Sequence, residues 1–82
     1  MVNVKFHPQF KKLFENIKDK NLKLKIIKHF IKIKENPEIG KPMRYSRKGT
    51  REVYIAPFRL SYAYVKSEDT ILLLDLYHKA EQ

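Results

Sequence analysis

The first half of the chain changes from a strand pattern to a helix pattern within a few residues. Residues 2–6 alternate apolar and polar side chains, which is the period of a β-strand with one buried face. Pro8 stops that strand and suits the first turn of a helix. Four apolar residues then follow at the helical spacing i, i+3, i+4, i+7, namely Phe10, Leu13, Phe14 and Ile17. The pattern predicts a strand that leads directly into a helix.

A second helix is predicted between two breaks in the pattern. Asp19, Lys20 and Asn21 interrupt the first helix, and Asn21 can cap the second. Pro37 ends it, because a residue before proline is pushed out of the helical region. One side of this helix is rich in lysine, and its apolar residues are Leu22, Ile26, Ile27, Phe30, Ile31 and Ile33. We expect the two helices to form a hairpin that lies on a sheet.

Three apolar runs in the second half predict three strands. These runs are 51–55, 60–65 and 70–77. Pro57 and residues 67–69 separate them by connections short enough for antiparallel hairpins, and the last run is apolar on both faces, as in a central strand. Residues 36–50 contain both glycines and predict a loop. The expected fold is α+β with the order β-α-α-β-β-β: a helical hairpin packed on one face of a twisted, mainly antiparallel sheet.

Length and composition limit the classes of function. A chain of 82 residues has room for one domain, so we expect a single domain over residues 1–82. No apolar run approaches the roughly 18 residues of a membrane span, and the first residues lack a signal-peptide pattern, so we expect a cytoplasmic protein. The absence of cysteine excludes disulfides and a cysteine nucleophile. With three histidines and no clustered carboxylates, we expect neither a metal centre nor a cofactor.

The charge favours a polyanionic partner or an acidic protein. Eighteen basic and nine acidic residues give a formal net charge of +9. All four arginines lie within residues 44–59, and arginine grips phosphate through a planar fork of donors, whereas lysine acts as a point charge. The many lysines have another explanation, since surface ion pairs of this kind occur in heat-adapted proteins. We apply that explanation to the helical lysines and not to the arginines.

The strand alternation places two candidate catalytic residues together. If Val65 pairs with Thr70, then Arg59 pairs with Leu76, and Arg59 and His78 lie on the same face, where one phosphate could contact both. Cleavage of RNA without a metal needs an acid or base and cations that hold the phosphate. His78 could act as acid or base, and Arg59 could stabilise the phosphate. Further cations and aromatic groups that could help are Arg47, Lys48, Arg51, Lys79, Tyr45 and Tyr77.

The two candidate catalytic residues also have structural interpretations. His78 could be a surface histidine, and Arg59 could form a salt bridge with Glu52, or with Asp75 if the register slips. His7 and His29 are assigned to structure. Basic residues with interleaved tyrosines indicate nucleic-acid binding more strongly than catalysis.

Several segments, taken in order, resemble the RelE/ParE superfamily of toxin proteins. The likeness covers most of residues 36–82, and the segments are Gly40–Met43, Gly49–Val53, Phe58–Tyr62, Ile71–Leu76 and Tyr77–Lys79. The preceding strand and helix pair fit the architecture of that superfamily. The resemblance implies a single RelE-like toxin domain.

The resemblance also implies an activity and partners. It implies the toxin of a type II toxin-antitoxin system, an mRNA interferase that cleaves messenger RNA in the ribosomal A site and is neutralised by a RelB-like antitoxin. Arg59 would support the scissile phosphate, with His78 and Lys79 as the other catalytic residues. The RNA-binding residues would be Arg44, Arg47, Lys48, Arg51 and Tyr77. The implied partners are the antitoxin, the ribosome and mRNA, without a cofactor.

One departure from the family leaves other functions open. RelE carries a catalytic tyrosine near its C-terminus, and residues 78–82 contain none, so His78 would have to fill that role, as a histidine does in the YoeB and YafQ branches. The ParE branch, which poisons DNA gyrase by binding, shares the fold. A non-catalytic RNA-binding module is the third possibility. We expect a partner antitoxin to be acidic, with an amphipathic helix that covers the basic face or displaces an element of the fold.

Overall fold

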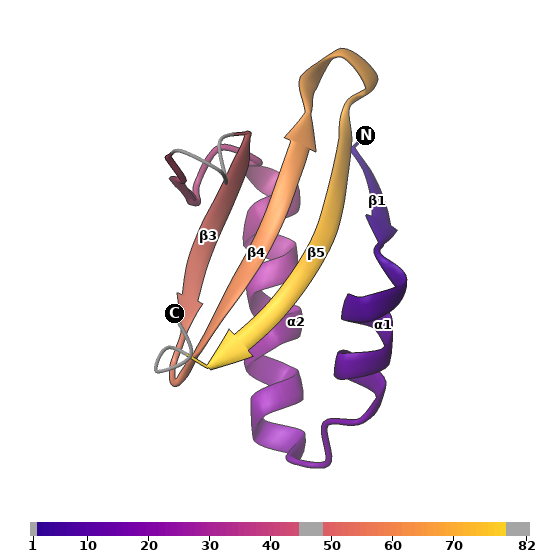
Figure 1. The fold of residues 1–82 in the computed structure, drawn as a ribbon, viewed down its shortest axis with the longest axis vertical. Coiled ribbons are helices and arrows are strands. Elements are labelled where there is room, and N and C mark those ends of the chain that lie inside the picture. Colours follow the sequence, from indigo (N-terminus) through magenta and orange to yellow (C-terminus); the bar gives the residue numbers. More distant parts are fainter. Residues whose placement is uncertain (1, 45–48, 79–82) are drawn as a thin grey trace.

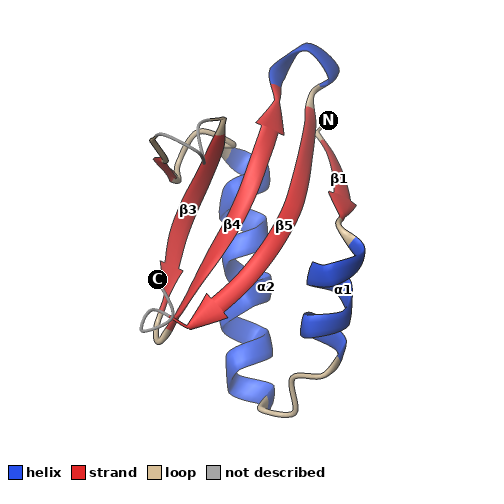
Figure 2. Cartoon of the chain, viewed as in Figure 1, coloured by secondary structure: helices blue, strands red, loops and turns tan. Residues whose placement is uncertain are grey.

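The computed structural model of the chain describes residues 2–44 and 49–78. Within this part, the helices α1 (Pro8–Glu15) and α2 (Lys20–Glu35) lie on one face of a five-stranded sheet (Figures 1 and 2). The strands are β1 (Asn3–Phe6), β2 (Lys41–Pro42), β3 (Thr50–Ile55), β4 (Phe58–Val65) and β5 (Thr70–His78), and a short 3-10 helix, η2 (Lys66–Glu68), joins the last two. The predicted α+β class is confirmed. The loop predicted for residues 36–50 contains the additional strand β2.

The sheet order explains the apolar character of the last strand. The order is β1-β5-β4-β3-β2, in which β1 runs parallel to β5 and the other neighbours are antiparallel. Strand β5 therefore has a partner along both edges, as predicted for a central strand. Its residues Ile71 and Leu73 are almost fully buried.

The hydrophobic core lies between the sheet and the helices. Its members come from α1, α2 and the last three strands, and they are Phe10, Ile26, Ile33, Ile55, Leu60, Tyr62, Ile71, Leu73 and Leu76. The apolar side of α2 is wider than the part of it that packs against the sheet. Ile27 and Ile31, two of the apolar residues of this helix, are 41% and 52% exposed. Ile26 and Ile33 alone are buried on this helix.

Both helices begin at a side-chain cap. The carboxylate of Asp19 accepts hydrogen bonds from the backbone N–H groups of Asn21 and Leu22, at 2.9 and 3.3 Å. The predicted cap at Asn21 is therefore wrong, because two cap-forming residues stand close together and the chain uses the earlier one. His7 caps α1, with its Nδ1 accepting from the backbone N–H of Gln9 at 3.1 Å.

Replacing the histidine cap of α1 should stabilise the protein. The first turn of α1 contains no acidic residue, and aspartate is preferred over histidine at an N-cap, where it also favours the positive end of the helix dipole. We expect His7→Asp to raise the free energy of unfolding by about 0.5–1 kcal/mol, measured by urea denaturation. His7→Ala is the control and should lower it. A less stable His7→Asp variant would contradict the capping role.

Candidate functional site

An irregularity between β4 and β5 determines which side chains meet at the predicted site. The pairing runs from Val65 with Thr70 to Tyr62 with Leu73, and then shifts, so that Ser61 pairs with Asp75. The shift skips Leu74, as in a β-bulge. From Ser61 back to Phe58, each β4 residue therefore pairs one residue further along β5 than the predicted register has it.

The bulge separates Arg59 from His78. Arg59 pairs with Tyr77 rather than with Leu76, and His78 pairs with Phe58. Because neighbouring residues of a strand point to opposite faces, Arg59 and His78 lie on opposite sides of the sheet. The rings of Phe58 and His78 meet edge to face at 5.6 Å, on the side covered by the helices. The prediction that one phosphate could contact Arg59 and His78 is therefore wrong.

Arg59 belongs to a row of side chains that crosses three strands on the face away from the helices, which we call the outer face. Tyr54 of β3 pairs with Arg59 of β4, and Arg59 pairs with Tyr77 of β5. The Arg59 guanidinium lies 5.8 Å from the centre of the Tyr54 ring, which is 53% exposed. Sequence reasoning missed Tyr54. The two-residue turn at Ala56 and Pro57 could have revealed it, because a turn of that length pairs Ile55 with Phe58 and therefore Tyr54 with Arg59.

A buried carboxylate holds Arg59. Its Nη1 lies 3.4 Å from Oε1 of Glu52, whose side chain is only 3% exposed. This is the salt bridge given as the structural alternative for Arg59. Asp75 instead accepts hydrogen bonds from Nε2 of Gln9, at 3.3 Å, and from the backbone N–H of Leu76, at 2.8 Å. Within the described residues, Nε of Arg59 is buried without a hydrogen-bond partner, so the guanidinium keeps one unsatisfied donor.

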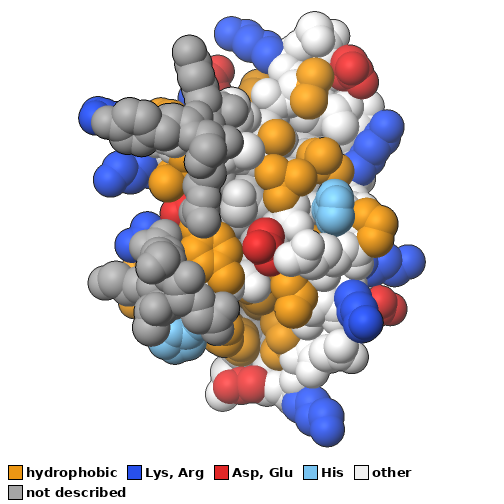
Figure 3. Space-filling view, in the orientation of Figure 1, with side chains coloured by type: hydrophobic (Ala, Val, Ile, Leu, Met, Phe, Trp, Pro, Cys, Tyr) orange, Lys and Arg blue, Asp and Glu red, His pale blue; other side chains and the backbone are white. Residues whose placement is uncertain are grey.

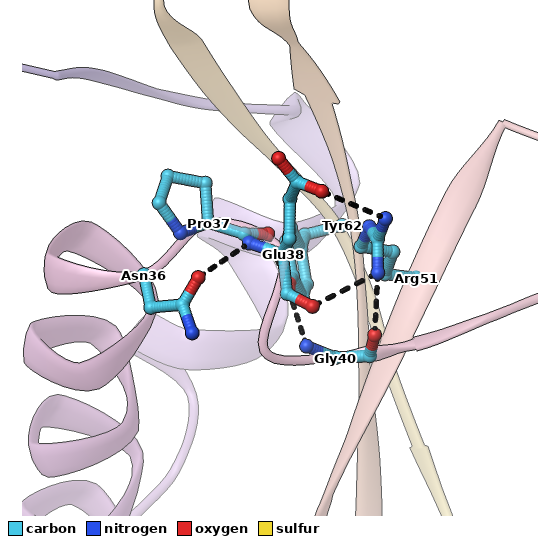
Figure 4. Close-up of polar contacts among 6 residues, drawn as sticks. All are labelled: Asn36, Pro37, Glu38, Gly40, Arg51 and Tyr62. Atoms are coloured by element: carbon cyan, nitrogen blue, oxygen red, sulfur yellow. Dashed lines mark hydrogen bonds and ion pairs between the residues drawn. The ribbon is translucent and has the colours of Figure 1, made fainter.

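Arg51 lies on the opposite face and has a structural partner set (Figure 4). It pairs with the core residue Tyr62, and its Nη1 donates to the backbone carbonyls of Glu38 and Gly40, at 2.9 Å each. Its Nη2 also lies 3.7 Å from the Glu38 carboxylate. The prediction that Arg51 could help Arg59 hold one phosphate is therefore wrong, whereas its predicted contact with RNA stays a prediction. Arg51 instead fixes the segment that follows α2.

Tyr62 anchors the same segment from inside the core. Its hydroxyl donates to the backbone carbonyl of Pro37 at 2.8 Å and accepts from the backbone N–H of Gly40 at 2.9 Å. A Cβ at Gly40 would lie 2.7 Å from this hydroxyl oxygen, so only glycine fits there. Burial raises the pKa of Tyr62, and the Gly40 hydrogen bond opposes that shift.

The other predicted site residues lie near or beyond the ends of the described segments. Arg44 is exposed after β2 and lines a hollow of about 440 Å³ with Lys41, Pro42 and Met43. Arg47, Lys48, Tyr45 and Lys79 lie outside the described residues, so their roles stay predictions.

The charge on the outer face is uneven. Figure 3 shows this face with an acidic group near its middle and most lysine and arginine side chains around the rim of the visible part.

The described residues contain no group of three or more histidine, aspartate or glutamate side chains that could hold a metal ion. No helix in residues 2–44 or 49–78 is long and apolar enough to cross a membrane.

Comparison with protein families and curated sequences gives one match. The model of the family described as "ParE toxin of type II toxin-antitoxin system, parDE" matches residues 4–82. No curated protein sequence matches the chain.

Several solved structures share the fold. The *Escherichia coli* RelBE toxin-antitoxin complex has a TM-score of 0.82 at 11% identity, over 95% of this chain and 96% of that one. A YoeB/ParE toxin from *Agrobacterium tumefaciens* has a TM-score of 0.85 at 17% identity, over 94% and 98% of the two chains. The heterotetrameric YoeB–YefM complex from *Staphylococcus aureus* has a TM-score of 0.78 at 23% identity, over 95% and 97%. At these identities the likeness concerns the fold.

Proposed function

The chain belongs to the ParE toxin family of type II toxin-antitoxin systems, and we propose that this toxin cleaves messenger RNA in the ribosomal A site. The resemblance to the RelE/ParE superfamily is thereby confirmed, and with it the class of the protein as a toxin. The substrate and the chemistry are the proposed part. A RelB-like or YefM-like antitoxin, the ribosome and mRNA are the proposed partners.

The row Tyr54–Arg59–Tyr77 is the observation that carries this proposal. It presents a guanidinium between two tyrosine positions on a β-sheet face. Single-stranded RNA is commonly bound on such surfaces, because bases stack on aromatic rings and arginine binds phosphate through charge-assisted hydrogen bonds. The formal net charge of +9 adds a general attraction for RNA.

The proposed reaction is attack of a ribose 2′-oxygen on the adjacent phosphorus. The bond from phosphorus to the 5′-oxygen breaks, which leaves a 2′,3′-cyclic phosphate and a 5′-hydroxyl, while the 2′-hydroxyl proton passes to solvent. Arg59 would stabilise the additional negative charge on the phosphate. Tyr77, the partner of Arg59 on the neighbouring strand, would donate its hydroxyl proton to the leaving oxygen. Lys79 is proposed as a further catalytic cation, and Arg44, Arg47 and Lys48 are proposed as RNA contacts.

Inhibition of DNA gyrase is the second candidate. The family match is to a ParE model, and His78 lies on the far side of the sheet from Arg59, which removes one expected acid or base from the outer face. A toxin that binds its target without chemistry does not need that group. The same positive charge would suit a DNA-associated enzyme.

Mapping messenger 5′ ends after brief expression separates the two candidates. We expect new 5′-hydroxyl ends within the coding region of a translated reporter, and none in the same reporter without its start codon. The purified toxin should leave gyrase supercoiling unchanged. Intact messengers together with inhibited supercoiling would overturn mRNA cleavage and support the ParE-type action.

A further inference from the structure

Glu52 occupies the row of side chains next to the Tyr54–Arg59–Tyr77 row. It pairs across the sheet with Ser61, and Ser61 pairs with Asp75, so the two carboxylates share the outer face with Arg59. Lys41 of β2 and Lys5 of β1 occupy the two edges of this face, opposite Glu52 and Leu72. This arrangement agrees with the acidic centre and basic rim seen in Figure 3.

We propose that Glu52 is a positioning residue that holds Arg59 in its row and restricts RNA contact on the outer face to a single phosphate. This inference rests on the proposed action on RNA. The contact that supports it is the 3.4 Å distance between Nη1 of Arg59 and Oε1 of Glu52, in a site where the carboxylate is nearly inaccessible to water.

The position of Glu52 limits how far a nucleic acid can follow the sheet. Adjacent rows on one face are two residues apart along a strand, which is about 7 Å. A strand of RNA that runs along β4 with one phosphate at Arg59 therefore brings a neighbouring phosphate over Glu52 and Asp75. Like charges in such an arrangement repel, and this repulsion is screened weakly at partly buried positions. A phosphate at the Arg59 row avoids the carboxylates when its neighbours are directed away from the Glu52 and Asp75 row.

The arrangement also explains how a chain with a net charge of +9 can discriminate among RNAs. A uniformly basic face would bind any single strand through phosphate neutralisation alone. With carboxylates in the middle of the face, affinity should grow little with the length of a free strand. The proposed substrate, messenger RNA held on the ribosome, would have to present one phosphate at a time.

The test compares binding of a long and a short ligand. The probes are a fluorescein-labelled oligouridylate of about a dozen nucleotides and uridine 3′-monophosphate, at about 0.1 M salt. We expect Glu52→Gln to raise the ratio of oligonucleotide to mononucleotide affinity by about threefold to tenfold. It should also steepen the salt dependence of oligonucleotide binding by about 0.7, the slope for one more phosphate contacted in a single strand. A variant that merely loosens the fold would lower both affinities and leave the ratio unchanged.

Two further variants make the test decisive. Asp75→Asn keeps an oxygen that can accept the hydrogen bonds from Gln9 and Leu76, and it should raise the same ratio even if Glu52→Gln folds poorly. Glu68→Gln, in the exposed helix η2, changes the net charge equally and should leave the ratio as in the wild type. Ratios for Glu52→Gln and Asp75→Asn no larger than that of Glu68→Gln would overturn the inference. If the affinity ratio rises in both variants but the toxin leaves messengers intact, the result would support the positioning role of Glu52 and count against mRNA cleavage.

Discussion

We expect expression of this toxin to arrest growth, and we expect replacement of Arg59 with alanine to abolish that arrest. Of the arginines that the structure describes, Arg59 lies between two tyrosine positions on the outer face, whereas Arg51 fixes the segment after α2 from the other side. Loss of a single preorganised charge donor at a reacting centre commonly lowers a rate by about 10²–10³. Colony counts and messenger cleavage after induction measure the effect. Lys28→Ala, an exposed change on α2, is the matched control and should stay toxic.

Loss of toxicity must be distinguished from loss of the fold. In Arg59→Ala the carboxylate of Glu52 stays buried without its arginine, which typically costs about 3 kcal/mol or more. The double variant Glu52→Gln/Arg59→Leu removes both charges and should keep a cooperative thermal unfolding transition. We expect this variant to be folded and non-toxic. A folded double variant that still arrests growth would contradict the role of Arg59, and toxicity of Arg59→Ala equal to that of Lys28→Ala would do the same.

Local patterns predicted the elements of the fold well. Pro8 follows an alternating run and precedes helical spacing, and the structure changes from β1 to α1 at that residue. The short connections at Pro57 and at residues 67–69 give two antiparallel pairs, as expected. Each of these features depends on residues close together in the chain, which is why sequence alone suffices.

The register of β5 could not be predicted in the same way. Residues 71–74 are all apolar, and a run without alternation does not show which residue a bulge skips. The skipped Leu74 exchanges the faces of Tyr77 and His78, so Arg59 pairs with Tyr77 instead of the predicted Leu76 and does not share a face with His78. The sequence of a strand buried between two neighbours thus does not show the position of the bulge, on which the predicted site depended.

For Arg51 the sequence did carry the necessary signal. Arg51, Val53 and Ile55 alternate along β3, and Ile55 is in the core, so the alternation places Arg51 on the same inner face. The partner set of Arg51 depends on backbone carbonyls of Glu38 and Gly40, which no side-chain pattern reveals. Arg51 and Arg59 are therefore close in sequence but lie on opposite faces of the sheet.

Removal of the Tyr62 hydroxyl, which anchors the segment after α2, should cause a large loss of folding stability. The hydroxyl satisfies the N–H of Gly40 and the carbonyl of Pro37, and the side chain is fully buried. In Tyr62→Phe both backbone groups lose this partner; an unsatisfied buried group costs about 1–3 kcal/mol, and the part-buried Pro37 carbonyl adds less because water can reach it. We expect the free energy of unfolding to fall by about 2–3 kcal/mol, measured by urea denaturation. Tyr64→Phe removes one exposed hydroxyl bonded to Asp69 and should have a much smaller effect.

The pH dependence gives an independent test of the same contact. Because burial raises the pKa of Tyr62 above its usual 10.0, the unfolded tyrosine releases its proton at a lower pH than the folded one. The folded state then binds more protons, so stability falls as pH rises above 10.0. Desolvation and the Asp69 hydrogen bond shift the pKa of Tyr64 in the same direction, and the Tyr64→Phe variant is therefore the proper background. In that background, Tyr62→Phe should reduce the alkaline loss of stability, and an unchanged loss would show that the Tyr62 hydroxyl is not held as the structure has it.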